Sequence, residues 1–216
     1  MITIGVTGGV GSGKSEILKY LDQNYNCRIL MSDNAAKDLE QPGGPLYEPL
    51  VKLLSEKGGA DGQRGELLME DGSINKQEMA ARIFGDPELL RKINELVHPA
   101  VNQYILEEID RERKEAEREF FVLESALLIE NGYDKILDSM WYIYCEESER
   151  SERLRRTRGY SDEKIRSIMD KQVSEDVFRA HCDTVIDNTG KFDAATGAAR
   201  QVDRAIRRLR ERFHKA

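Results

Sequence analysis

The sequence predicts an α/β protein in which helices cover both faces of a five-stranded parallel sheet, a three-layer α/β/α arrangement. Five short apolar runs have the composition of buried strands, and helical sequence follows each of the first four. Right-handed helical crossovers join such strands into a parallel sheet. A glycine-rich segment links the first run to the first helical pattern. With 216 residues, the chain suits one domain with a smaller helical part or lid.

The first strand, 2–7, ends at a segment with the pattern G-x-x-x-x-G-K-S, which runs from Gly8 to Ser15. Its glycines allow several backbone N–H groups to face one concavity, and the helix that starts near Gly13 adds its positive N-terminal dipole. Lys14 can then reach the outer phosphates of a nucleotide, and the Ser15 hydroxyl can bind Mg²⁺. The pattern predicts a P-loop and with it the P-loop NTPase fold. The alternative is a plain glycine-rich turn between strand and helix.

A second strand, 27–31, is followed by Ser32-Asp33 at the start of a helical pattern. Asp33 has two interpretations that its position alone does not separate. As an N-cap residue it accepts a backbone N–H bond, a common use of aspartate at a turn from strand to helix. As a catalytic carboxylate it lies at the edge of the sheet where the P-loop also begins.

A largely helical region follows, from about 41 to 117. Helical patterns cover 46–57 and 75–84, and the polar, glycine-rich segment between them predicts a surface loop. A longer helix begins at Asp86-Pro87 and meets His98-Pro99, where the proline ring interrupts or kinks it before the apolar stripe resumes. At that discontinuity His98 either contacts a ligand or caps the helix.

The third strand, 120–124, is apolar until it ends at Glu124. An acidic residue in this position is typical of a Walker B carboxylate, which lies near Mg²⁺ and its bound water. The chain then continues into Leu127-Leu128-Ile129. These three apolar residues belong either to the core or to a substrate pocket.

After the fourth strand, 140–145, the composition changes to a dense group of arginines: Arg150, Arg153, Arg155, Arg156 and Arg158. An arginine cluster inside an acidic protein is a candidate clamp for a polyphosphate. The alternative is a solvated helix face on which nearby glutamates pair with the arginines. Gly159 and Ser161 predict a turn between two helices, the form of a closing lid. A fifth strand, 183–188, and a final amphipathic helix over about 192–213 complete the chain.

The charge of the chain argues against nucleic-acid and membrane partners. Lys and Arg number 33 and Asp and Glu number 40, a net charge of −7, so the overall field repels polyanions. No stretch has the length of a membrane span or the pattern of a secretory leader, and we therefore expect a cytoplasmic protein. Cys27, Cys145 and Cys182 lack the spacing of a metal site and are interpreted as reduced structural thiols.

Taken together, the chain resembles the dephospho-coenzyme A kinase family along nearly its whole length. The matching segments are Thr7 to Ser15, Ser32-Asp33 with Ala36 and Leu39, Gln41-Pro42-Gly43, His98-Pro99, Leu127 to Glu130, Gly159-Tyr160-Ser161, Gln172, and Val185 to Gly190. A P-loop alone indicates only an NTPase, whereas this ordered set is far more specific.

The resemblance implies ATP-dependent phosphorylation of the ribose 3′-hydroxyl of dephospho-coenzyme A, the last step of coenzyme A synthesis, with Mg²⁺ accompanying ATP. It implies a phosphate-binding Lys14 and a catalytic base at Asp33. The ATP site that it implies comprises Gly11, Ser12, Gly13, Lys14, Ser15, Glu16 and Asn188, with Ser15 at the metal and Asn188 near adenine. The acceptor site that it implies comprises Asp33, His98, Pro99, Glu124 and Leu127.

Three positions depart from the family pattern. Met31-Ser32-Asp33 retains only the last carboxylate of the usual Asp-Ala-Asp, and Glu124 stands where an aspartate is usual. The usual lid arginine corresponds to Thr157, with Arg156 and Arg158 on either side. We therefore expect Arg156 and Arg158 to share the catalytic clamp on the phosphates.

The expected organisation is a single kinase domain, 1–216, in three parts. Its core covers 1–40, 118–147 and 183–216, its helical acceptor-binding region about 41–117, and its helical lid about 148–175. ATP and dephospho-coenzyme A are the expected partners of a monomer or weak homo-oligomer. The alternatives are another P-loop nucleotide or metabolite kinase and, from a different class, a non-catalytic nucleotide-binding switch. The guanine motif N-K-x-D of such switches is missing near the C-terminal strands.

Overall fold

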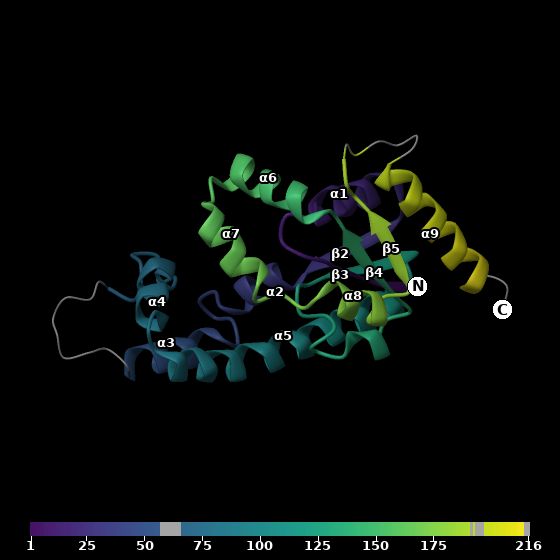
Figure 1. Ribbon diagram of the computed structural model, residues 1–216. Coiled ribbons are helices and arrows are strands. Elements are labelled where there is room, and N and C mark those ends of the chain that lie inside the picture. The colour runs from purple at the N-terminus through teal and green to yellow at the C-terminus, as the bar shows by residue number, and fades with distance from the viewer. Residues whose placement is uncertain (57–65, 191, 193–196, 214–216) are drawn as a thin grey trace. The chain divides into compact units, whose positions relative to one another are not determined.

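The computed structural model describes residues 1–56, 66–190, 192 and 197–213 (Figure 1). The chain divides into two compact units: a sheet unit, Met1–Met31 with Arg111–Ala216, and a helical unit, Ser32–Asp110. The surface loop expected after the helical pattern 46–57 falls at 57–65, outside the described residues. Among the helices that are described, none has the length and apolar character needed to cross a membrane.

The sheet unit is built on five parallel strands in the order β2-β3-β1-β4-β5 (Figure 1). Their bounds are Ile2–Thr7 (β1), Cys27–Met31 (β2), Phe120–Glu124 (β3), Ser139–Tyr144 (β4) and Thr184–Asp187 (β5). The predicted five-stranded parallel sheet is thus confirmed. β1 is the middle strand, paired with β3 and β4. The loop after β1 therefore starts at the centre of the carboxyl edge of the sheet, where α/β sheets bind ligands.

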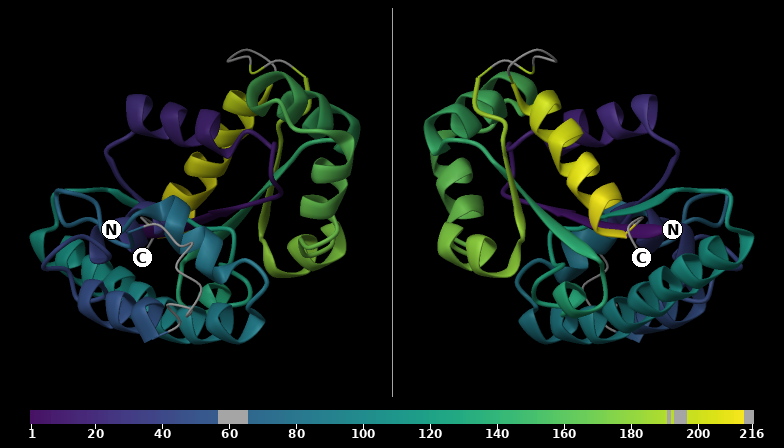
Figure 2. Two further views of the ribbon diagram at one scale, coloured as in Figure 1. Left: turned by 90° about the vertical axis from the view of Figure 1, so that its left-hand side faces the viewer. Right: turned by 90° about the vertical axis from the view of Figure 1, so that its right-hand side faces the viewer.

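Helices lie on both faces of this sheet. The bounds in the sheet unit are Lys14–Asn24 (α1), Tyr133–Lys135 (the 3₁₀ turn η1), Glu147–Arg158 (α6), Asp162–Met169 (α7), Glu175–His181 (α8) and Ala198–Phe213 (α9). α1 and α9 pack together against one face (Figure 2). α8 packs on the opposite face of β4, where Phe178 stacks on Tyr142 with ring centroids 4.6 Å apart. The predicted three-layer α/β/α arrangement is confirmed.

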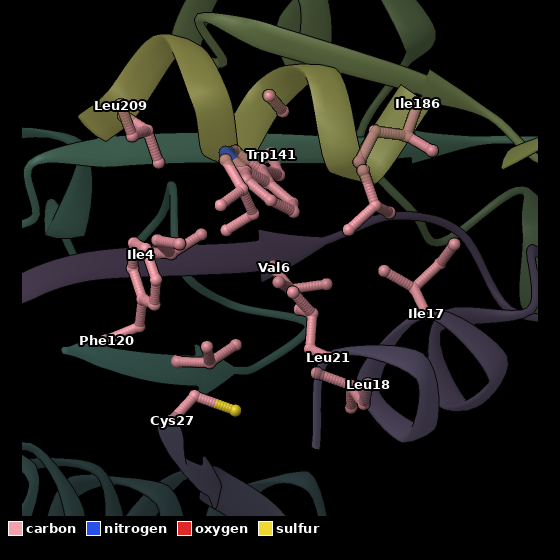
Figure 3. Packing of buried hydrophobic residues seen from close by; sticks show 14 of the residues in the cluster. Ile4, Val6, Ile17, Leu18, Leu21, Cys27, Phe120, Trp141, Ile186 and Leu209 are labelled. Carbon is pink, nitrogen blue, oxygen red and sulfur yellow. The ribbon is translucent and has the colours of Figure 1, made fainter. Parts of the chain in front are cut away.

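The apolar core of the sheet unit lies between the sheet and the helices α1 and α9 (Figure 3). All six residues of β1 are buried. On this face its side chains Ile4 and Val6 pack with Ile17 of α1 and Trp141 of β4, and all four are fully buried. Burial of each such side chain contributes about 1.5–3 kcal/mol. The loop between β1 and α1 is therefore anchored at both ends in well-packed elements.

Linked hydrogen bonds satisfy the indole N–H of the buried tryptophan. Trp141 Nε1 donates to Ser139 Oγ at 3.0 Å, and Ser139 Oγ donates to Asp183 Oδ1 at 2.7 Å. The backbone N–H of Met140 donates to the other carboxylate oxygen of Asp183 at 3.0 Å. An unpaired buried N–H would cost about 1–3 kcal/mol. These hydrogen bonds avoid that cost, and they join β4 to Asp183, the residue that precedes β5.

The helical unit contains α2 (Ser32–Leu39), α3 (Tyr47–Glu56), α4 (Lys76–Ile83) and most of α5 (Pro87–Glu115). α4 begins where the Asn75 side chain accepts the backbone N–H groups of Gln77 and Glu78. The buried Arg82 donates to Glu78 Oε1 at 2.8 Å and to the carbonyl oxygen of Leu54 at 3.0 Å. Because Leu54 belongs to α3, Arg82 ties the two helices together.

α5 continues through His98 and Pro99 without interruption. The sequence pattern allowed a break here, because a proline inside a helix removes one hydrogen bond and costs about 3 kcal/mol. Apolar side chains are buried on both sides of the proline, with Leu89 and Ile93 before it and Ile105 after it. The burial of this continuous stripe offsets the cost of the proline.

Candidate active site

The loop between β1 and α1 has backbone conformations suited to a phosphate site. Gly8, Gly11 and Gly13 have positive φ angles of 146°, 80° and 84°. Gly13 directly precedes α1, and a Cβ atom there would lie 2.2 Å from Asn188 Nδ2. No larger residue fits without displacing Asn188. A helix N-terminus that follows glycines in such conformations is a common setting for bound phosphate.

Lys14 lies over this loop, in contact with Gly8 and Glu124. Its Nζ donates to the carbonyl oxygen of Gly8 at 2.9 Å and lies 3.6 Å from Glu124 Oε1. Glu124 ends β3 and is opposite Val6 of β1, so the sheet register brings its carboxylate beside the loop. The side chains of Lys14 and Glu124 are only 17% and 12% exposed, and limited solvent strengthens their attraction.

The serines of the loop differ in accessibility. Ser15 and Glu16 are exposed in the first turn of α1. Ser12 is only 1% exposed, and its Oγ has no hydrogen-bond partner within the described part of the chain. Buried hydroxyls normally have a partner. An unpaired hydroxyl inside this loop is consistent with a ligand that supplies one.

Asn188, which follows β5, is joined to the loop and to α6. Its buried Nδ2 donates to the carbonyl oxygen of Ser12 at 2.8 Å. Arg153 of α6 donates to the carbonyl oxygens of Asn188 at 2.8 Å, Gly190 at 3.0 Å and Ser12 at 3.4 Å. Glu149 accepts from Arg153 at 2.6 Å and from the Gly190 N–H at 2.7 Å. The P-loop, the start of α6 and the segment after β5 thus form one hydrogen-bonded frame.

Arg150, one turn before Arg153 on α6, lies directly on the P-loop. Its Nε donates to the carbonyl oxygen of Val10 at 3.0 Å, and its Nη2 donates to Gln172 Oε1 at 3.0 Å. The same oxygen of Gln172 accepts the backbone N–H of Val10 at 3.2 Å. Gln172 follows α7, so the segment predicted as a lid contacts the P-loop from both α6 and the end of α7.

Arg156 and Arg158, the two arginines expected to clamp phosphate, are exposed on α6. Arg158 lies over the ring of Tyr160, 5.9 Å from its centroid. α6 starts beside the sheet at Glu147, and at about 1.5 Å per residue Arg158 is about 16 Å further along the axis. Arg150 and Arg153 lie in the first two turns. The described contacts therefore bring this earlier pair to the loop. The sequence placed both residues in the candidate arginine cluster, but the expected clamp was assigned to Arg156 and Arg158.

In the helical unit, Asp33 and His98 lie on different helices. Asp33 is exposed in the first turn of α2, which starts at Ser32 directly after β2. It is therefore inside the helix rather than at the cap position that precedes it, and its charge is favourable beside the positive end of the dipole. His98 and Pro99 line a groove of ≈ 520 Å³ along α5, whose other lining residues are Pro87, Leu90, Arg91, Asn94 and Glu95.

The apolar segment after β3 divides between core and surface. Leu128 is fully buried, whereas Leu127 is 37% exposed and its backbone N–H is held by Ser125 Oγ at 3.1 Å. The sequence left open whether this segment belongs to the core or to a substrate pocket, and Leu128 belongs to the core. Leu127 is free to contact a ligand.

All three cysteines are buried as free thiols. Burial raises the pKa of Cys27 to about 11 and that of Cys182 to about 12, and it also raises the pKa of Cys145. A raised pKa keeps a thiol protonated and unreactive near neutral pH. The interpretation of these residues as structural thiols agrees with this burial.

The sheet order, the glycine conformations and the placement of Lys14 define a nucleotide-binding protein of the P-loop kinase class. The family model described as CoaE, dephospho-CoA kinase, matches residues 2–194, and the chain belongs to this family.

Known relatives agree with this placement. A dephospho-CoA kinase from Corynebacterium glutamicum is 32% identical over 196 residues, which cover 89% of this chain and 93% of the relative. A crystal structure from Thermus thermophilus is 26% identical, with a TM-score of 0.72 over 98% of this chain and 97% of its own. A dephospho-CoA kinase structure from Campylobacter jejuni shares the fold, with 20% identity and a TM-score of 0.70 over 96% of each chain.

Proposed function

We propose that this protein transfers the γ-phosphoryl group of ATP to the ribose 3′-hydroxyl of dephospho-coenzyme A, yielding coenzyme A and ADP. The observation that carries the proposal is a family match over residues 2–194 together with an intact P-loop. In that loop Lys14 bonds to Gly8 and lies beside Glu124. Phosphoryl transfer depends mainly on positioning and on neutralising charge, and this loop is built for both.

The ATP end of the proposed site consists of the P-loop and Asn188. The backbone from Gly11 to Glu16 binds the phosphates, and Lys14 neutralises the outer ones. The side-chain N–H of Asn188 donates to the Ser12 carbonyl. Asn188 would lie near the adenine. Lid closure would bring further positive charge, and the assignment of the clamp to Arg156 and Arg158 stays a prediction from sequence.

Mg²⁺ fits the donors that the loop offers. The hydroxyl of Ser15 is exposed at the start of α1, and the carboxylate of Glu124 ends the neighbouring strand β3. Hydroxyl and carboxylate oxygens are the ligands that Mg²⁺ takes beside water and phosphate. Ser15 would hold the ion, with Glu124 close to its bound water. When bound, Mg²⁺ would neutralise charge on the phosphates.

Asp33 is proposed as the base. It would accept the proton of the 3′-hydroxyl while that oxygen forms its bond to the γ-phosphorus and the bond to the ADP oxygen breaks. Its exposed position in the first turn of α2 leaves the carboxylate accessible. His98, Pro99 and Leu127 would contact the acceptor. The protein is proposed to act in the cytoplasm. It is also proposed to be a monomer or weak homo-oligomer, and light scattering tests this oligomeric state.

A direct assay tests the function. Purified protein is incubated with ATP and Mg²⁺ beside dephospho-coenzyme A and a panel of other nucleosides with free 3′- or 5′-hydroxyls, and ADP and the phosphorylated product are measured. The highest kcat/KM is expected for dephospho-coenzyme A. A higher value for another acceptor would identify a different small-molecule kinase. ATP binding without transfer to any acceptor would favour a nucleotide-binding switch.

A further inference from the structure

Arg150 differs from Arg153 and Arg155 of the same helix in how its charge is compensated. Arg153 pairs with Glu149 at 2.6 Å, and Arg155 pairs with Asp162 at 2.6 Å. Arg150 is half-buried, and within the described part of the chain its guanidinium has no carboxylate partner. It bonds instead to two neutral oxygens, those of the Val10 carbonyl and the Gln172 amide.

The close approach of Arg150 depends on Gly9. A Cβ atom at Gly9 would lie 2.5 Å from both Cζ and Nη2 of Arg150 and 2.8 Å from its Nη1. Because all three guanidinium atoms are this near, the planar group lies flat over the backbone of Gly9. Gly8, Gly11 and Gly13 have positive φ angles, but Gly9 does not. Glycine at this position therefore makes room for the arginine and is not needed for the turn.

Gln172 fixes both partners of this contact. Its Oε1 accepts the N–H of Val10 at 3.2 Å and an N–H of Arg150 at 3.0 Å. One oxygen thus holds the backbone of the loop and the guanidinium of Arg150 next to each other. The guanidinium of Arg150 therefore has hydrogen-bond acceptors, but these acceptors are neutral and leave its positive charge uncompensated.

The location of Arg150 identifies which phosphate it would meet. Lys14 Nζ bonds to the carbonyl of Gly8, so the start of the loop lies at the ammonium end of that lysine. In P-loops this ammonium meets the β- and γ-phosphates. Gly9 and Val10, on which Arg150 lies, directly follow Gly8. A partly desolvated cation at this place gains strongly from an anionic partner, and arginine suits the geometry of a phosphoryl group.

We propose that Arg150 is the lid arginine that binds the γ-phosphoryl group of ATP, that Gln172 positions it, and that Gly9 admits it. This inference rests on the proposed function. During transfer, the N–H groups of Arg150 stabilise charge on the γ-phosphoryl oxygens as the bond to the acceptor oxygen forms and the bond to ADP breaks. Arg150 gives up no proton in this step.

The test compares single variants in binding and in turnover. Arg150→Ala is expected to lower kcat by about 10²–10³-fold, as removal of one preorganised donor does elsewhere. It should weaken the binding of a non-hydrolysable ATP analogue, measured by calorimetry, much more than the binding of ADP. Arg155→Ala removes an exposed arginine of the same helix and is the matched control, expected to leave both quantities unchanged.

Two further variants keep the inference falsifiable if Arg150→Ala fails to fold. Gln172→Glu retains an acceptor at the same place but adds a carboxylate that neutralises Arg150, so it should selectively weaken the ATP analogue without lowering the melting temperature. Gly9→Ala should displace the guanidinium and have the same selective effect. Equal affinities of these variants and the wild type for the analogue would overturn the inference.

The rival assignment is tested in parallel. If the double alanine variant of Arg156 and Arg158 loses kcat while Arg150→Ala stays within threefold of the wild type, the clamp lies where sequence predicted and Arg150 has only a structural role. The proposed function can fail separately. A wild-type protein that ignores dephospho-coenzyme A, yet prefers the ATP analogue over ADP through Arg150, would refute that function and retain the inference.

Discussion

Replacing Asn188 with alanine is expected to lower both the stability of the protein and its affinity for ATP. Asn188 is 2% exposed, and its side chain donates to the Ser12 carbonyl at 2.8 Å. Without this bond, the 3.4 Å contact with Arg153 is what remains for that oxygen among the described residues. Losing this buried bond should cost about 1–2 kcal/mol. In a chain of this length each kcal/mol lowers the melting temperature by about 2–4 °C, so we expect a fall of about 2–8 °C. Because Ser12 belongs to the P-loop, the ATP affinity should fall as well.

Asn24 provides the matched control for this prediction. Its Nδ2 also donates to a backbone carbonyl at 2.8 Å, that of Tyr20, but on the exposed surface of α1. Asn24→Ala should therefore change the free energy of unfolding by less than about 0.5 kcal/mol. Scanning calorimetry measures both melting temperatures, and titration calorimetry measures ATP binding. Equal shifts in the two variants, or an Asn188→Ala protein with unchanged ATP affinity, would refute the reasoning that burial and the loop contact set the effect.

Three further predictions concern the lysine, the base and the thiols. Lys14→Ala should abolish phosphoryl transfer with an unchanged far-UV circular dichroism spectrum, because Lys14 belongs to the loop and not to the apolar core; near-normal turnover would contradict its role. Asp33→Asn keeps size and helix position, so ATP affinity should persist while transfer falls about 10²–10⁴-fold, and a retained rate would show that the base lies elsewhere. With pKa values raised from 9.0 to about 11 and 12, Cys27 and Cys182 add stability that is complete below pH 9 and is lost as pH rises through 11–12. Iodoacetamide at pH 8.5 should accordingly alkylate them far more slowly in the native protein than in urea, and similar rates would show that the thiols are accessible.

Much of the fold could be predicted because its signals are local. The largely apolar β1 and β3 are recognisable as buried strands, and the helix expected to start near Gly13 is α1, which begins at Lys14. α8 was missed because Phe178 is the one buried residue among its seven, so no periodic stripe marks it. The continuity of α5 through Pro99 depends on buried contacts along the whole helix, which residues around a proline do not reveal.

The site could be predicted where its chemistry lies in consecutive residues, as from Gly8 to Ser15. The sequence could not show which arginines of α6 contact the P-loop, because that depends on how far each turn of α6 lies from the end of β4. Glu149 and Arg153 have the spacing of a helical ion pair, a signal that was available. Their bonds to the segment after β5 join residues about forty positions apart and follow only from the fold.

The buried tryptophan also determines what optical spectroscopy can detect in this protein. Trp141 is the single tryptophan of the chain, it is fully buried in β4, and its indole N–H is bonded to Ser139. Its fluorescence should shift to longer wavelength when water reaches the sheet unit. The helical unit, Ser32–Asp110, contains no tryptophan and would be spectrally silent. A fluorescence melt therefore follows one unit, and a circular dichroism melt that occurs earlier would reveal independent unfolding of the other.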